Sequence, residues 1–186
     1  MKELWRAWYG AFPPAWCDNV VDRAQARPAQ SGTVGSTAGQ IVDPTYRSST
    51  IRWLDHTGGE LDIANKLHTY IKLANRESFG VDIWDMSSIQ FTEYHATATG
   101  KYDWHHDVAF TNPEPFDRKL SVIVQLSNPN DYSGGDFEFY NETPSPAFRL
   151  QGTIVVFPSF LLHRVTPVTA GIRRSLVSWI DGPKWR

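Results

Sequence analysis

The chain has 186 residues, a formal net charge of −2 and a single cysteine, Cys17. This length suffices for one domain whose core needs no staples. A slightly acidic charge gives no reason to expect nucleic acid or an anionic membrane as a partner. One cysteine excludes an intrachain disulfide and a cysteine-based zinc cluster.

No apolar run approaches the ~18 residues of a membrane helix. The first residues, Met1–Arg6, lack the apolar segment of a signal peptide. We therefore expect a soluble, cytoplasmic protein in a reducing compartment. The eight Trp, ten Phe and seven Tyr residues indicate an aromatic-rich interior and cleft.

The first 80 residues predict two strands and two helices. Pro13 and Pro14 end an aromatic-rich run and suit the first turn of a helix. Apolar residues then recur at helical spacing, and they do so again in the second helix. The segment between them is rich in Ser, Gly and Thr and predicts a long mobile loop, often a lid or a binding segment. The expected elements are a strand at 5–12, a helix at 15–26, the loop at 29–46, a strand at 47–54 and a helix at 60–78.

From Ser87 onward the helical spacing disappears, and short strand-like runs are separated by turn residues such as Asn112-Pro113 and Ser133-Gly134-Gly135. Many short strands at regular spacing argue for a sandwich or barrel. The expected runs are 87–96, 102–107, 118–127, 135–140, 153–157, 161–166 and 173–181. The fold class that follows is α+β, mainly β, in one domain over residues 1–186, with the N-terminal helices buttressing one sheet.

The centre of the chain carries the first candidate metal ligands. If Tyr102–Asp107 is extended, His105 and Asp107 point to one face and His106 to the other. An imidazole beside a carboxylate makes two-thirds of the 2-His-1-carboxylate triad that suits non-heme Fe(II). His-x-Asp alone is a weak signal, because a structural strand explains most such tripeptides. A second histidine is needed, and His163 is the candidate.

His163 lies in a run with strand propensity, where Leu161 and Val165 would share its face. The ordinary interpretation is a buried histidine bonded to a backbone carbonyl. The His-x-Asp pair makes a shared metal site the better interpretation. A β-bulge, which is frequent near active sites, would let His106 or His95 exchange roles with the proposed ligands.

A third feature follows ten residues after His163. On a strand, Arg173, Ser175 and Trp179 share a face, while Leu176 points into the packing layer. A buried arginine needs a partner, because an unpaired buried charge is costly. Its planar fork suits a carboxylate, to which Ser175 could also donate. The alternative is an arginine paired with an internal Asp or Glu.

The combination of His105-x-Asp107, His163 and Arg173-x-Ser175 resembles the Fe(II)/2-oxoglutarate-dependent dioxygenases. Its local sequence resembles the prolyl 4-hydroxylase branch, including small bacterial and phage hydroxylases. The resemblance covers about residues 85–183, the expected β-helix core, preceded by the strand and helices of 1–80. The matching pieces are Tyr94, Gly100–Asp107, Arg118–Ser127, Tyr132–Phe137, His163–Thr169 and Gly171–Arg173, with Arg47-Ser48-Ser49 as a shorter, earlier match.

The resemblance implies a double-stranded β-helix, or jelly roll, with Fe(II) bound by His105, Asp107 and His163. It implies that 2-oxoglutarate chelates the metal and that Arg173 holds its far carboxylate. The cofactors would be Fe(II), 2-oxoglutarate and O2, with ascorbate as a reductant. The products would be succinate, CO2 and a hydroxylated substrate.

Further residues match positions with known roles in the family. Tyr94 resembles the tyrosine that reaches the cosubstrate. Trp179 resembles the aromatic wall of the pocket, although core packing alone also explains it. Arg118 resembles a substrate contact of some relatives, although a solvated edge residue also fits. Gln125 stands where some relatives have a tyrosine on the 2-oxoglutarate carboxylate, so the second anchor is either Ser175, our choice, or Gln125.

The resemblance implies a peptide or protein substrate hydroxylated on a prolyl residue. A free amino acid or small metabolite is the alternative, because the expected substrate-facing loops, 29–46 and 111–117, carry no readable code. A zinc hydrolase could use two histidines and one Asp but would not need Arg173-x-Ser175. A nucleic-acid demethylase of the same superfamily carries another arginine where this chain has Trp179. A non-catalytic β-sandwich binding module is the last alternative.

Overall fold

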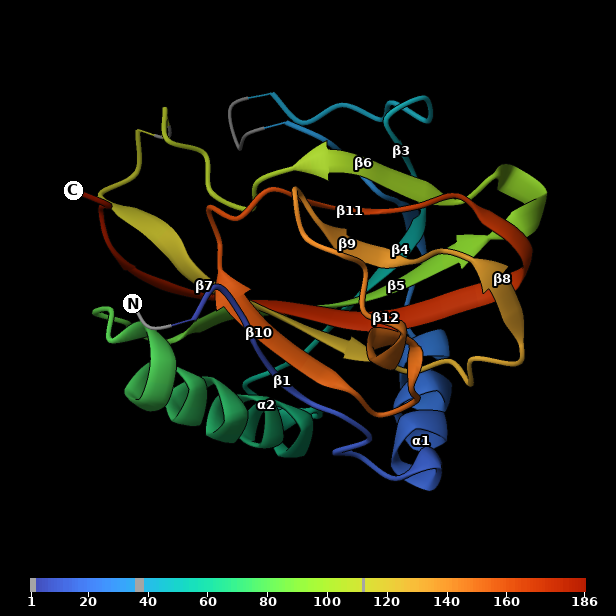
Figure 1. The fold of residues 1–186 in the computed structure, drawn as a ribbon, viewed down its shortest axis with the longest axis horizontal. Coiled ribbons are helices and arrows are strands. Elements are labelled where there is room, and N and C mark those ends of the chain that lie inside the picture. Colours follow the sequence, from blue (N-terminus) through green and yellow to red (C-terminus); the bar gives the residue numbers. More distant parts are fainter. Residues whose placement is uncertain (1–2, 36–38, 112) are drawn as a thin grey trace.

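The computed structural model describes residues 3–35, 39–111 and 113–186. Two antiparallel sheets face each other, and two helices cover the outer face of the larger sheet (Figure 1). This is the mainly β architecture with buttressing helices that the sequence predicts. None of the helices in the described ranges is long and apolar enough to span a membrane.

The larger sheet runs in the order β1-β10-β7-β12-β5-β4-β2, and β8 pairs with the beginning of β12. The smaller sheet runs in the order β3-β6-β11-β9. The strands of the larger sheet are β1 (Arg6–Trp8), β2 (Gln30–Ser31), β4 (Thr50–Leu54), β5 (Met86–His95), β7 (Phe116–Gln125), β8 (Tyr132–Gly134), β10 (Ile154–Pro158) and β12 (Val168–Pro183). Those of the smaller sheet are β3 (Arg47–Ser48), β6 (Lys101–His105), β9 (Phe137–Phe139) and β11 (His163–Val165).

A proline begins the first helix and a glycine ends the second helical segment. Helix α1 (Pro14–Gln25) has Pro14 at its first position, where a missing N–H costs nothing. Helix α2 (Leu61–Ala74) continues as a π-helical turn, Asn75–Phe79, which stops at Gly80 with φ +62°. Glycine adopts this left-handed conformation without strain.

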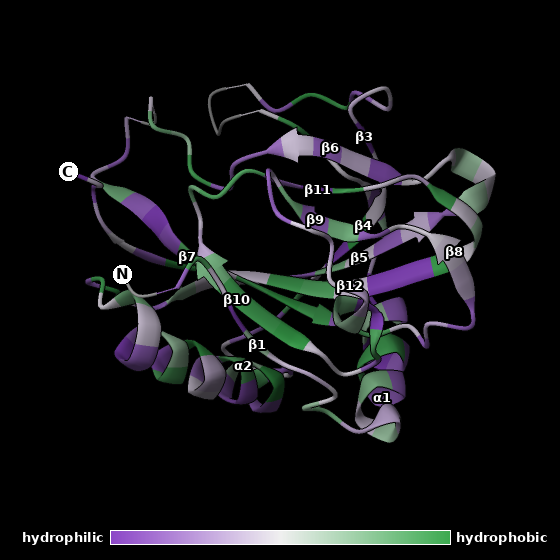
Figure 2. Ribbon diagram, in the orientation of Figure 1, coloured by the Kyte–Doolittle hydropathy of each residue, from purple (hydrophilic) through white to green (hydrophobic). Residues whose placement is uncertain are grey.

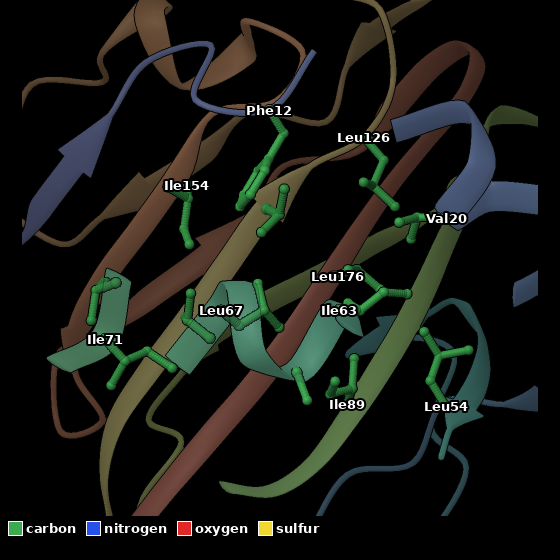
Figure 3. Packing of buried hydrophobic residues seen from close by; sticks show 14 of the residues in the cluster. Phe12, Val20, Leu54, Ile63, Leu67, Ile71, Ile89, Leu126, Ile154 and Leu176 are labelled. Carbon is green, nitrogen blue, oxygen red and sulfur yellow. The ribbon is translucent and has the colours of Figure 1, made fainter. Parts of the chain in front are cut away.

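The alternation of β12 separates two environments. Leu176 and Ile180 are fully buried in the layer between the larger sheet and the helices, whereas Ser175 and Val177 face the space between the sheets. Figure 3 shows that first layer, with Leu176 near side chains of α2 such as Ile63. In Figure 2 the half of β12 beside β8 is hydrophilic, and the half that crosses α2 is hydrophobic. One strand therefore supplies both core and cavity wall.

A second apolar cluster fills part of the space between the sheets. It consists mainly of aromatic and β-branched side chains from both sheets and surrounds His163: Tyr94, Ile123, Phe137, Phe139, Phe148, Val155, Phe157, Val165 and Val168. The aromatic-rich interior expected from the composition is thus concentrated beside the candidate site.

Several predicted boundaries are wrong for identifiable reasons. The expected strand at 47–54 is two strands in different sheets, because the chain changes sheet at Ser49: β3 pairs with β6 and β4 with β5. The loop at 29–46 contains β2 and a bridge between Val34 and Ile41, while its residues 36–38 lie outside the described ranges. Ser133 and Gly134, expected in a turn, belong instead to strand β8, which is held by its pairing with β12; local propensity does not encode this pairing.

Candidate active site

Strand pairing brings the two histidines together. His105 ends β6 and His163 begins β11, and the two residues are direct partners in the antiparallel register. Their ring centroids are 4.2 Å apart. Asp107, two residues beyond the end of β6, completes the group: its carboxylate oxygens lie 3.8 Å from His105 Nε2 and 3.6 Å from His163 Nε2. Sequence positions more than fifty residues apart thus meet in one cluster.

The hydrogen bonds of the imidazoles favour a metal between them. His105 Nδ1 lies 2.7 Å from the carbonyl oxygen of Asp103, and His163 Nδ1 lies 2.8 Å from that of Leu161. Because a carbonyl oxygen only accepts, each Nδ1 carries the hydrogen and each Nε2 offers a lone pair toward Asp107. One donor atom from each of the three residues lies within 4.8 Å of the others. This donor set fits non-heme Fe(II).

Ser121 and Ser159 form a hydrogen-bonded chain that ends at the carboxylate of Asp107. Ser121 Oγ lies 2.6 Å from Asp107 Oδ2, and Ser159 Oγ lies 2.9 Å from Ser121 Oγ. A carboxylate only accepts, so the single hydroxyl hydrogen of Ser121 goes to Asp107, and Ser159 donates to Ser121. The N–H of Asp107 donates to the carbonyl of Ser159 at 2.9 Å. Both serines are fully buried, and the sequence reasoning missed them.

The electrostatics favour the metal-binding protonation states. Burial, with the nearby His163, lowers the pKa of His105 from 6.5 to about 3, so its imidazole is neutral at physiological pH. Burial alone raises the pKa of Asp107, but His163, His105, Arg118 and the hydrogen bond from Ser121 outweigh it and hold this pKa below its usual value. A neutral His105 imidazole beside an ionised Asp107 carboxylate is the combination that metal coordination requires.

A cavity, hereafter the main cavity, opens beside the triad. Its lining includes Tyr94, Arg173, Ser175, Val177 and Trp179, so the predicted cavity face of β12 is confirmed. The side chains of Val165 and Val177 add apolar wall.

Arg173 is 3% exposed and sits beside Tyr94 in the sheet register, with its guanidinium 5.6 Å from the tyrosine ring. Its Nη1 donates weakly to Ser175 Oγ at 3.5 Å. Within the described ranges no carboxylate lies within 4 Å of it, so the interpretation as an internal ion pair is wrong. A buried guanidinium without an anion is suited to receive a carboxylate ligand.

Gln125 is directed away from the main cavity. Its Nε2 donates to the carbonyl of Ser127 at 3.2 Å and to the hydroxyl of Tyr132 at 3.1 Å. It lines a separate side cavity together with Tyr132 and Arg173. Ser175, its neighbour in the sheet register, does line the main cavity. The geometry favours Ser175 over Gln125 as the second anchor.

Arg118 and Trp179 form one wall of the main cavity. The guanidinium carbon of Arg118 lies 3.9 Å from the indole ring centre, and Trp179 is 6% exposed. Arg118 is therefore a cavity residue and not simply a solvated edge residue. It also lines an outer groove, defined here by Tyr46, Trp104, Phe116 and Arg118, that leads away from the triad.

The structure corrects the expected position of Leu161 and places His106 and His95 outside the metal site. Leu161, expected on the strand face of His163, lies in the turn before β11 and is not part of the main-cavity lining. Its carbonyl oxygen instead accepts a hydrogen bond from His163 Nδ1. His106 is exposed and its Nδ1 lies 2.6 Å from the carbonyl of Phe160. His95 ends β5 and is half-buried outside the main cavity. Neither histidine exchanges places with the triad.

Two residues of the site were not assigned roles from the sequence. The ring of Tyr102 stacks on His105, with centroids 3.5 Å apart and planes 11° from parallel. The guanidinium carbon of Arg47 lies 4.5 Å from the centre of the same tyrosine ring. Both residues line the main cavity. The Arg47-Ser48-Ser49 match and the position of Tyr102 beside the His-x-Asp motif were the available signals.

Comparison with known proteins identifies the family. Residues 89–181, which include the triad and Arg173, match the 2OG-Fe(II) oxygenase superfamily. The chain belongs to this superfamily. Membership confirms the expected cofactors, Fe(II), 2-oxoglutarate and O2, and excludes the zinc-hydrolase and binding-module alternatives.

The oxygenase is similar to PKHD-type hydroxylases. It is 31% identical over 127 residues to one from Colwellia psychrerythraea, covering 66% of this chain and 57% of that protein. It is 41% identical over 83 residues to one from Synechococcus sp. strain CC9311, covering 44% of this chain and 37% of that protein. The chain thus matches about half the length of these relatives or less.

Solved structures show the same fold. The viral collagen prolyl hydroxylase from Paramecium Bursaria Chlorella virus-1 superposes with a TM-score of 0.71, at 19% identity and 97% coverage of both chains. A Pseudomonas putida prolyl-4-hydroxylase gives 0.70, at 21% identity, covering 95% of the oxygenase and 91% of that chain. The predicted jelly-roll fold is confirmed.

Proposed function

We propose that this oxygenase is an Fe(II)- and 2-oxoglutarate-dependent dioxygenase that hydroxylates a prolyl residue of a peptide or protein. The observation that carries the proposal is the convergence of His105, Asp107 and His163 in the lining of a cavity that also contains the buried Arg173, which has no carboxylate within 4 Å among the described residues. The similarity to PKHD-type hydroxylases and to prolyl hydroxylase structures supports the choice of substrate.

In this proposal the Nε2 atoms of His105 and His163 and the carboxylate of Asp107 hold Fe(II). Arg173 binds the far carboxylate of 2-oxoglutarate through its planar fork, with Ser175 as a second donor and Tyr94 beside them. When bound, Fe(II) and 2-oxoglutarate supply the oxidising chemistry, which converts the cosubstrate to succinate and CO2 and places one oxygen atom of O2 on the substrate.

The remaining work of the protein is orientation and exclusion of water. Val165, Val177 and Trp179 provide apolar wall around the reacting space. Ser121 and Ser159 fix the rotation of the Asp107 carboxylate, so this side chain does not have to reorient when the metal binds. We also propose that residues 1–186 act as one domain and that the enzyme is cytoplasmic, a location in which the buried Cys17 stays a free thiol.

A peptide substrate fits the surface beyond the triad. The outer groove shares Tyr102, His105, Asp107 and Arg118 with the main cavity, so a chain lying in it reaches the metal site. Its aromatic lining suits proline-rich segments, which dock in aromatic grooves as preformed extended helices. A structural neighbour from Trichoplax adhaerens is a prolyl hydroxylase in complex with a peptide fragment of hypoxia inducible factor.

The proposal is tested by succinate release with Fe(II), 2-oxoglutarate and O2 across proline-rich peptides, followed by mass spectrometry for the gain of one oxygen. Matched peptides with alanine in place of proline are the control. We expect peptide-stimulated succinate release and an oxygen gain confined to proline-containing peptides. Oxygen gain on free proline alone would move the substrate to the small-molecule alternative, and succinate release without added Fe(II) or none under any condition would reject the assignment.

A further inference from the structure

The arginines of this chain divide sharply according to whether they have an anionic partner. Eight of the twelve have a carboxylate oxygen within 4 Å: Arg6, Arg23, Arg27, Arg52, Arg76, Arg149, Arg164 and Arg174. Within the described ranges, the other four have none: Arg47, Arg118, Arg173 and Arg186. Arg186 is exposed at the end of the chain, and the other three all line the main cavity.

Of these three, Arg173 already has a proposed ligand, the far carboxylate of 2-oxoglutarate. Arg47 is the more buried of the remaining two. It is 8% exposed, its Nε donates to Ser49 Oγ at 2.9 Å, and its Nη1 donates to the carbonyl of Thr33 at 3.0 Å. Its guanidinium lies over the face of Tyr102. All of these partners are neutral, so they position the fork without cancelling its charge. A buried charge is costly unless an opposite charge meets it.

The bound cofactors would not supply that opposite charge. The carboxylate of Asp107 and the two carboxylates of 2-oxoglutarate carry three negative charges, which balance the two of Fe(II) and the one of Arg173. Arg118 has Asp181 as its neighbour in the sheet register. Burial raises the pKa of Asp181, and the charge of Arg118 offsets only part of that rise. The register neighbour of Arg47 is the neutral Tyr102, and among the residues that the structure describes no carboxylate lies within 4 Å of Arg47. The loaded cavity therefore retains an excess positive charge at Arg47.

We propose that the substrate of this enzyme carries a carboxylate, which Arg47 binds beside the target proline. The inference rests on the proposed function and specifies its substrate class. The stacking distances, 4.5 Å from Arg47 to Tyr102 and 3.5 Å from Tyr102 to His105, place the guanidinium within about two residues' length of the metal ligand. The carboxylate therefore belongs to an adjacent Asp or Glu side chain or to the terminal carboxylate of the prolyl residue itself.

The test is a set of binding titrations without turnover. The enzyme, loaded with Fe(II) and 2-oxoglutarate and kept free of oxygen, is titrated with matched pairs: Glu-Pro and Gln-Pro peptides, Pro-Glu and Pro-Gln peptides, and N-acetylproline and its amide. We expect the carboxylate member of at least one pair to bind about tenfold or more tightly, as a charge-assisted hydrogen bond allows. The peptide and acetylproline arms distinguish the two sources of the carboxylate.

Variants assign the preference to its residue. Arg47→Gln should reduce the ratio of the two affinities to about twofold or less, and Arg47→Lys should retain part of it, because the charge remains while the fork is lost. Arg76→Gln, at an exposed arginine paired with its neighbour Glu77, makes the same change in net charge and should keep the wild-type ratio. Ratios are compared only for variants with the circular dichroism spectrum of the wild type.

Equal affinities in all three wild-type pairs would overturn the inference. A full carboxylate preference in both Arg47→Gln and Arg47→Lys would also overturn it, because the preference would then not depend on the arginine. The two proposals fail separately. A carboxylate preference without hydroxylation in air supports carboxylate binding by Arg47 and rejects prolyl hydroxylation as the function. Hydroxylation with no carboxylate preference in any pair supports the proposed function and rejects the role of Arg47.

Discussion

The substitution Ser121→Ala isolates the support behind the Asp107 carboxylate. It removes the 2.6 Å hydrogen bond to Asp107 Oδ2 and leaves the hydroxyl of Ser159 without its 2.9 Å acceptor, at a site with no access to water. A hydrogen bond to a charged group contributes about 1.5–3 kcal/mol. Loss of such support to a ligand typically lowers metal affinity about 10–100-fold, which equals about 1.4–2.7 kcal/mol. The two figures agree.

The assay is the dissociation constant for Co(II), measured in the metal-loaded protein by competition with a chelator. We expect Ser121→Ala to raise it about 10–100-fold and Ser159→Ala to raise it less, because the direct bond from Ser121 to Asp107 survives. Because Co(II) is bound without turnover, the result does not depend on substrate identity. An unchanged constant in Ser121→Ala would show that the serine only fills space and would refute the reasoning.

Three further predictions follow from the site. Arg173→Ala should raise the apparent KM for 2-oxoglutarate about tenfold or more, since a charge-assisted bond is lost; an unchanged KM in steady-state assays would move that role elsewhere. His105→Ala and Asp107→Ala should each abolish succinate release, and near-normal turnover by either would reject the triad. The metal-free protein should lose stability as the pH falls from 6.5 toward 3, because unfolded His105 takes up a proton at 6.5 and the folded residue only at about 3. Thermal unfolding across this range measures the loss, and a constant Tm would contradict it.

The parts of the site that the sequence predicts are those carried by local periodicity. On β12, Arg173, Ser175 and Trp179 alternate with Leu176, and the structure places them on opposite sides of the sheet. The His-x-Asp pair follows the same logic at first, although β6 ends at His105 and the backbone bond from Asp107 to Ser159, not a strand, sets the direction of the carboxylate. The sequence predicts that His105 and Asp107 point to the same site, but it does not predict the backbone bond to Ser159 that places Asp107.

The parts that escaped prediction depend on contacts between distant segments. Ser121 and Ser159 meet only because β7 and the turn after β10 lie side by side, and serine has no pattern that marks such a meeting. Arg47 reaches the main cavity because the chain changes sheet at Ser49, which strand propensity does not reveal. Gln125 was kept as the rival of Ser175 by analogy with relatives, and its hydrogen bonds to Ser127 and Tyr132 hold it outside the main cavity.

The two-sided construction of β12 bears on how this protein can be altered. Its side chains toward the helices, such as Leu176 and Ile180, are fully enclosed and leave no room for change. On the other side Val177 borders the main cavity, where a different side chain alters the shape of that cavity and leaves the apolar layer beneath the sheet intact. Directed evolution of a new specificity can therefore begin at Val177, because the positions toward the helices secure the scaffold and Arg173 and Ser175 are assigned to the cosubstrate.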